Sequence, residues 1–198
     1  WNDAAAERRS TLPAASEGKV DFVADVYQFQ GAEGRTRLEI VYQVDIGSFQ
    51  STDSIVDFQA ELRILDREDT EVFRQSLNKS VRRAESQHYL DRFVLEAEPD
   101  TFSYTLTVRR SGDNYSGRAE AELPVVSMGG EPSVSDLYFI SRTMAGEEGS
   151  PFMKSGAVIV PNVSRFYETD RYSHVTVYYE INNLEYNTGG ETAYYHSR

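Results

Sequence analysis

The chain has 198 residues, of which 39% are hydrophobic and 26% charged, so it is long enough for one or two domains with a buried core. Its formal net charge of −12 disfavours nucleic acid and anionic lipid surfaces as partners. The lack of cysteine excludes disulfides and thiol chemistry in this stretch, and no apolar run is long enough to be a transmembrane segment.

The first 19 residues are polar and rich in alanine. Asp3 to Arg9 fits one or two helical turns, which are too few to be stable alone, and Pro13 would end such a helix. We therefore expect residues 1–19 to form an extended or partly helical arm. Because the chain begins with Trp1, we also expect that a leader segment was removed or that other residues precede it.

From Val20 onward, apolar and polar residues alternate, which is the period of a half-buried β-strand. In the clearest run, Leu38 to Ile46, only Val41 breaks the alternation. The pattern predicts seven strands, at about 20–29, 35–46, 55–66, 70–78, 86–97, 101–110 and 115–126. Residues 79–90 are ambiguous, since Val81 to Glu85 also fits a helical turn.

Seven short strands separated by turns are typical of an immunoglobulin-like sandwich. The sequence thus predicts an all-β chain with an Ig-like antiparallel β-sandwich over residues 20–127. Six apolar residues are expected in its core: Phe58, Leu62, Ile64, Leu95, Leu106 and Val108.

Residues 128–133 have the composition of a linker, and residues 134–198 form a second β domain or part of one. Strands are expected at 134–142, 157–161, 174–184 and 192–198, with a loop at 143–150. Val175, Val177, Tyr179 and Ile181 alternate with other residues, which predicts that they share one strand face. This segment is too short to close a sandwich by itself.

Four pieces of the second segment occur in an order that resembles the GWxTD-domain family: 135–139 (SDLYF), 152–156 (FMKSG), 160–166 (VPNVSRF) and 177–184 (VYYEINNL). The resemblance covers about residues 20–190. It implies the N-terminal part of a bacterial secreted or envelope protein, with a β-sandwich before this segment. The Gly-Trp-x-Thr-Asp motif that names the family is absent, since the only tryptophan is Trp1. The family implies no catalytic residues.

No residue pattern predicts catalysis, a metal site or a cofactor. His88, His174 and His196 lack the spacing of a metal pair, and there is no Gly-x-Ser-x-Gly elbow. Asp66, Glu68 and Asp69 crowd one turn, but the spacing is not that of a twelve-residue calcium loop, and a solvated hairpin turn explains them. We expect the chain not to be an enzyme.

Tyrosines are unusually concentrated in the second segment. If Tyr179 faces the core, Tyr178 faces outward, because neighbouring residues of a strand point to opposite faces. Cross-strand packing and a glycan-binding platform are alternatives to a protein interface. The interface hypothesis names Trp1, Tyr172, Tyr178, Tyr186, Tyr194 and Tyr195.

We therefore expect a non-catalytic binding or scaffold subunit in the periplasm or otherwise outside the cytoplasm of a bacterium. Its partners would be other protein subunits of a larger membrane-associated complex, for example a photosynthetic or respiratory one, which it stabilises as an extrinsic accessory protein. The alternatives are a carbohydrate-binding module and the non-catalytic N-terminal part of a larger secreted enzyme.

Overall fold

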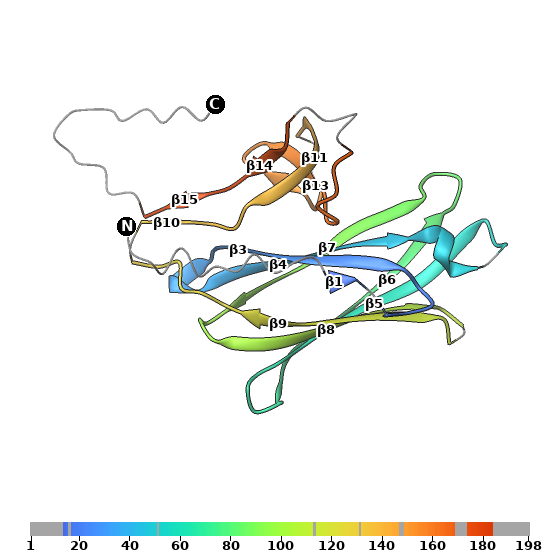
Figure 1. Ribbon diagram of the computed structural model, residues 1–198, viewed down its shortest axis with the longest axis horizontal. Helices are drawn as coiled ribbons and strands as arrows, with labels where there is room; N and C mark the ends of the chain where they lie inside the picture. Colours follow the sequence, from blue (N-terminus) through green and yellow to red (C-terminus); the bar gives the residue numbers. More distant parts are fainter. Residues whose placement is uncertain are drawn as a thin grey trace.

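The computed structural model describes residues 14–15, 17–50, 52–112, 114–130, 132–146, 149–168 and 174–183. These residues form an all-β structure of several antiparallel sheets, as predicted. Figure 1 shows three layers: two sheets of a sandwich and a smaller β unit that lies over one of them. The first sandwich contains seven long strands, β3 (Phe22–Gln30), β4 (Thr36–Asp45), β5 (Ile55–Leu65), β6 (Glu71–Arg82), β7 (His88–Ala97), β8 (Thr101–Arg110) and β9 (Ser116–Pro124).

The sandwich has the strand connectivity of an Ig-like fold. The front sheet has the order β1-β3-β4-β7, where β1 is Ala14–Ala15, and the back sheet has the order β2-β9-β8-β5-β6, where β2 is Glu17–Gly18. Counting from β3, the front sheet thus holds long strands one, two and five, and the back sheet holds strands seven, six, three and four. Two short 3-10 helices, Ala32–Gly34 and Ile46–Phe49, lie at the ends of β3 and β4. This arrangement confirms the predicted sandwich.

The core between the two sheets follows the alternation in the sequence. Phe58, Leu62, Ile64, Leu106 and Val108 are buried there, and Leu95 is partly buried against them. The aromatic rings of Phe49 and Phe58 stack with their centroids 5.4 Å apart. Burial of alternate apolar residues from both sheets is the main source of stability of such a sandwich.

Part of the expected arm belongs to the sandwich. Strand β1 (Ala14–Ala15) pairs with β3, and β2 (Glu17–Gly18) pairs with β9, so the chain passes from the front sheet to the back sheet within five residues. Gly117 permits this close approach, because a Cβ at that position would collide with the carbonyl oxygen of Val20. Residues 1–13 lie outside the described residues.

The ambiguous stretch around residues 79–90 is not helical. Strand β6 continues to Arg82, which pairs with Ile55 of β5. A short turn then leads into β7 at His88. The predicted fourth strand ended too early, at residue 78. Lys79 and Ser80 are polar residues on an edge strand, and therefore carry little of the apolar pattern that sequence reading depends on.

The second unit, residues 132–183 where described, contains two small sheets. Strands β11 (Tyr138–Ala145), β12 (Met153–Lys154), β13 (Ala157–Pro161) and β14 (Thr176–Tyr178) form a sheet of order β12-β13-β11-β14. Strand β10 (Ser133–Val134) pairs with β15 (Ile181–Asn182). The loop expected at 143–150 begins later, because residues 143–145 pair with residues 157–159 of β13. The strand expected at 192–198 lies outside the described residues.

Leu106 provides a test of the sandwich core, since its side chain is fully buried between the sheets. We expect Leu106→Ala to lower the free energy of unfolding by about 2–5 kcal/mol, because the substitution removes buried methyl groups and leaves a cavity. Urea denaturation measures this loss. The control Ile55→Ala truncates a side chain that is 44% exposed and should cost much less. Equal losses for both variants would contradict the position of the core.

Candidate functional site

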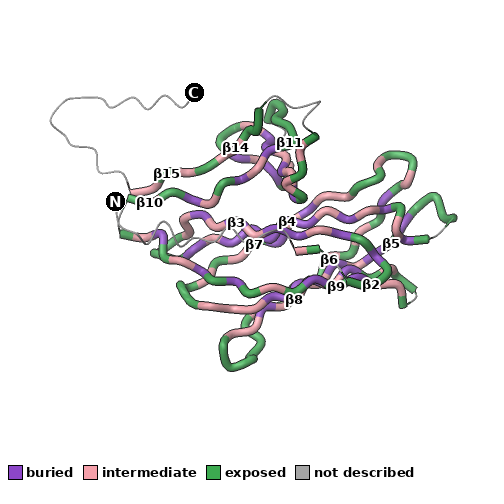
Figure 2. Tube along the Cα trace, in the orientation of Figure 1, coloured by how far each residue is buried: buried purple, intermediate pink, exposed green. Residues whose placement is uncertain are grey.

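The second unit covers much of the outer face of the front sheet (Figure 2). Tyr27 and Phe29 of β3 and Val41 of β4 point away from the sandwich core and are fully buried. Together with residues of the second unit they make a second apolar core, which includes Tyr138, Ile140, Phe152, Val158, Ile159 and Val163. We call this contact between front sheet and second unit the seam.

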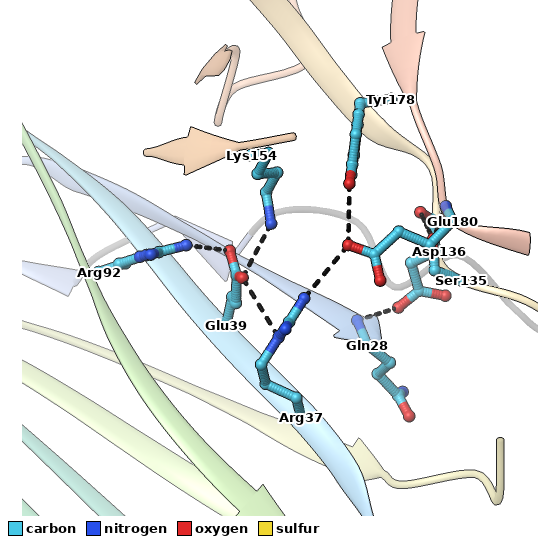
Figure 3. A network of polar contacts seen from close by, with 9 residues as sticks. All are labelled: Gln28, Arg37, Glu39, Arg92, Ser135, Asp136, Lys154, Tyr178 and Glu180. Atoms are coloured by element: carbon cyan, nitrogen blue, oxygen red, sulfur yellow. Dashed lines mark hydrogen bonds and ion pairs between the residues drawn. The ribbon is translucent and has the colours of Figure 1, made fainter. Parts of the chain in front are cut away.

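A buried carboxylate lies at one end of the seam. Glu39 of β4 is only 2% exposed, and its two oxygens accept hydrogen bonds from Lys154 Nζ at 2.9 Å and from Arg92 Nη1 at 2.6 Å (Figure 3). Arg92 comes from β7 and Lys154 from β12, so Glu39 joins two neighbouring strands of the front sheet to the second unit. Bonds between charged groups are about twice as strong as neutral ones.

Three aromatic rings lie close to the Lys154 ammonium. The Nζ atom lies 3.9 Å from the centroid of Phe29, 4.9 Å from that of Tyr138 and 5.4 Å from that of Tyr178. Ring faces attract cations, and this attraction grows where water is excluded. Burial lowers the pKa of Lys154, while Glu39 acts in the opposite direction and favours the charged form.

Two further ion pairs cross the seam. Arg37 Nη2 lies 3.3 Å from Glu180 Oε1, which also accepts a hydrogen bond from the Tyr178 hydroxyl at 2.9 Å (Figure 3). Arg165 makes a two-pronged contact with Asp25 of β3, at 2.8 and 2.7 Å. Burial raises the pKa of Asp25, while its bonds to Arg165 act to lower it.

Backbone contacts also tie the second unit to β3. The Gln28 N–H donates to Asp136 Oδ2 at 2.8 Å, and the Asp136 N–H donates to the Gln28 carbonyl at 3.0 Å. The seam thus combines an apolar core, buried ion pairs and backbone hydrogen bonds. A pocket of about 260 Å³ opens at its edge, lined by Arg37, Glu39, Arg92, Val94, Met153, Lys154, Ser155, Tyr178 and Glu180. The charged groups in this lining are the ion-paired ones.

The second unit presents an apolar surface on the side away from the seam. Tyr178 and Glu180 point towards the seam, so Tyr179 and Ile181 point outward, as do Val134 opposite Ile181 and Leu137 beside Tyr179. The exposed fractions of the five apolar side chains on this surface range from 38% to 51%. We call this set the apolar face: Val134, Leu137, Val175, Tyr179 and Ile181.

The structure reverses the expected direction of the tyrosine pair. Tyr178 packs against the seam core, with its ring 6.3 Å from that of Phe29, and Tyr179 is the exposed member. The prediction that Tyr178 faces outward was wrong, because the apolar surface of the front sheet attracts this side of the strand. Trp1, Tyr172, Tyr186, Tyr194 and Tyr195 lie outside the described residues.

Sequence reasoning missed Glu39, Arg92 and Lys154. Each lies in a strand with alternating pattern or a short polar stretch, where a charged residue normally faces water. The available signal was apolar: Val41 interrupts the polar face of its strand, and Tyr27 and Phe29 add large rings to the same face. An apolar outer face on a sheet of a sandwich indicates that a further layer covers it.

Within the described ranges, no group of three or more His, Asp or Glu side chains is arranged to hold a metal ion. In the same part of the chain, no helix is long and apolar enough to cross a membrane. No protein-family model matches the chain, and no curated protein shows significant similarity to it. The resemblance to the GWxTD-domain family therefore stays a prediction.

The buried carboxylate provides a test of the seam. We expect Glu39→Gln to lower the free energy of unfolding by about 3–5 kcal/mol, because it leaves Lys154 and Arg92 without a charged partner. Lys154→Met should cost less, because Glu39 keeps Arg92 and a thioether packs well among aromatic rings. Urea denaturation of both variants measures the difference.

An exposed ion pair supplies the control for this test. Arg82 and Glu85 are both more than two-thirds exposed, so Arg82→Gln should change stability very little. A loss from Glu39→Gln as small as that from Arg82→Gln would show that Glu39 does not hold the seam.

Proposed function

We propose that this chain is a non-catalytic binding or scaffold subunit of an extracytoplasmic bacterial assembly, and that its apolar face contacts another protein. The observation that carries the proposal is the apolar face itself. Five exposed apolar side chains lie on two antiparallel segments that run side by side, from 133 to 140 and from 175 to 182. Clusters of exposed apolar side chains of this kind mark interaction sites more often than single exposed residues do.

The seam makes the apolar face a rigid surface. Tyr178 and Glu180 alternate with Tyr179 and Ile181 in the chain, so the residues that anchor the strand to the seam also fix the outward ones. A surface that is already ordered loses less conformational freedom on binding, which favours affinity. An ordered binding surface supports a scaffold role, which requires no catalytic groups.

The partner that fits this face is a protein with an apolar β-surface. The four-stranded sheet of the second unit packs on the front sheet, and the apolar face lies on β10, on β15 and on the residues next to β11 and β14. β-Proteins bury apolar sheet faces against a further layer. A partner strand pair or sheet would supply that layer and complete the second sandwich. Such a contact should bury at least about 1,000 Å² if it is specific.

The described tyrosines give less support to a carbohydrate-binding module. Tyr138 and Tyr178 point into the seam, so among the described residues of the paired strands only Tyr179 offers an exposed tyrosine ring. Stacking of a sugar normally needs an exposed aromatic platform. A protein interface uses the aliphatic neighbours of Tyr179 as well.

A photo-crosslinking amino acid in place of Ile181 tests the proposal. In cells that make the chain natively, we expect it to capture one defined protein, because Ile181 lies within the apolar face. The same amino acid in place of Ile55, which is also 44% exposed, should not capture that protein. Mass spectrometry of the crosslinked species identifies the partner.

Charge substitution then measures what the apolar face contributes. Leu137→Asp should weaken binding of the identified partner on the order of tenfold or more, because it buries an unpaired carboxylate in the interface. Ile55→Asp is the matched control and should bind like the parent. If Leu137→Asp also binds like the parent, or if Ile55 captures the same protein, the apolar face is not the interface.

A further inference from the structure

The ammonium group of Lys154 lies among side chains that together have the chemistry of a cation-binding site. Glu39 Oε1 accepts a hydrogen bond from its Nζ atom at 2.9 Å (Figure 3). Three ring centroids lie 3.9, 4.9 and 5.4 Å from Nζ, those of Phe29, Tyr138 and Tyr178. Ring faces combined with a carboxylate are well suited to bind an organic ammonium ion. We call these four side chains, Glu39, Phe29, Tyr138 and Tyr178, the cage.

The side chains of the cage are held by contacts that do not involve Lys154. Arg92 Nη1 donates to the second carboxylate oxygen of Glu39 at 2.6 Å. Phe29 and Tyr138 are fully buried in the seam core, with their ring centroids 6.1 Å apart, and the Tyr178 ring lies 6.3 Å from that of Phe29. The cage is therefore ordered independently of its ammonium ion. A site that is already ordered loses little conformational freedom on binding.

The groups of the cage select one class of ligand. The faces of aromatic rings are electronegative, so they attract a cation and disfavour an anion. One carboxylate supplies too few oxygen ligands for a calcium or magnesium ion. Glu39 Oε1 accepts a hydrogen bond, and a primary ammonium ion can donate one while a quaternary ion cannot. The ligand that fits the cage is therefore a primary alkylammonium ion.

A tight hairpin supplies this ligand from within the chain. Strands β12 and β13 are joined by Ser155 and Gly156, and Lys154 pairs with Ala157 across the turn. Both turn residues have positive φ, 48° and 84°, as a two-residue type I′ turn requires. The turn fixes the place of Lys154 beside the front sheet, so the tether gives its ammonium group a high effective concentration at the cage. A free ammonium ion therefore competes poorly in the parent chain.

We propose that the cage is a binding site for primary alkylammonium ions, that Lys154 occupies it as a tethered ligand, and that it binds a free alkylammonium ion once the lysine side chain is shortened. A ligand can enter from the pocket at the edge of the seam, because Lys154, Glu39 and Tyr178 line that pocket. This inference concerns the seam and does not depend on the apolar face.

The variant Lys154→Ala with n-propylammonium chloride tests the proposal, because this ion replaces the atoms that the substitution removes. We expect the ion to raise the urea midpoint of unfolding of the variant in a saturable manner, with a dissociation constant in the millimolar range. Neutral 1-propanol and sodium chloride at equal concentration should not do so. The parent chain and Lys154→Met should not respond, since a side chain already fills their cages.

Two outcomes of this titration would overturn the proposal. One is an effect of n-propylammonium on Lys154→Ala no larger than that of 1-propanol. The other is an equal effect on the parent chain, which would show binding elsewhere.

The role of the rings is tested in the same Lys154→Ala background. Adding Tyr178→Leu removes one ring face and should weaken binding of n-propylammonium about two- to fivefold. Adding Tyr178→Phe removes only the hydroxyl that bonds Glu180 and should leave binding unchanged. Equal binding by the leucine and phenylalanine variants would contradict the assignment of Tyr178 to the cage.

A covalent test applies even where Lys154→Ala does not fold. The chain contains no cysteine, so Lys154→Cys introduces a single thiol. In the urea-unfolded chain, its thiolate displaces bromide from 2-bromoethylamine and forms a C–S bond, which restores a side chain of lysine length with a terminal ammonium group. Reaction with 1-bromopropane gives a neutral side chain of the same length.

After refolding, only the aminoethyl side chain can place an ammonium group in the cage. We therefore expect the aminoethylated chain to unfold at a higher urea concentration than the propylated chain. An equal or lower midpoint for the aminoethylated chain would overturn the proposal.

Discussion

Buried carboxylates anchor the contact between the front sheet and the second unit, and Glu39 has charged partners on both sides of that contact. Glu39 accepts hydrogen bonds from a residue of the same sheet and from a residue of the second unit, and all three groups have little contact with water. An ionised carboxylate without these partners would be costly to bury. Glu39 therefore constrains where β7 and β12 lie, and the rings around Lys154 constrain it further.

The seam explains why the molecule consists of three layers. A β-sheet with apolar side chains on both faces must be covered on both faces. Tyr27, Phe29 and Val41 make the outer face of the front sheet apolar, and the second unit covers it. The second unit in turn lacks enough strands among the described residues to bury its own outward side. That side remains apolar and exposed, which is the basis of the proposed interface.

Most of the first sandwich could be predicted from the sequence, because its strands alternate apolar and polar residues and end in turns. Where the pattern weakened, at the end of β6 and in residues 14–15 and 17–18, the prediction was wrong, since edge strands and two-residue strands have little apolar periodicity. Val41 was visible in the sequence as an exception to the alternation, and it lies where the second unit covers the front sheet. The ion pairs of the seam could not be predicted, because partners such as Glu39 and Lys154 are 115 residues apart.

The sequence could not predict which face of a strand turns towards the core. The alternation of Val175, Val177, Tyr179 and Ile181 predicted that these residues share one face, but period alone does not say which face meets the core. The choice depends on the surface that each face meets. Tyr178 and Glu180 find Phe29, Lys154 and Arg37 at the seam, so their side of the strand turns inward. The opposite side of this segment, with Val175, Tyr179 and Ile181, is then exposed. The orientation of the segment therefore fixes both the contact at the seam and the exposed surface.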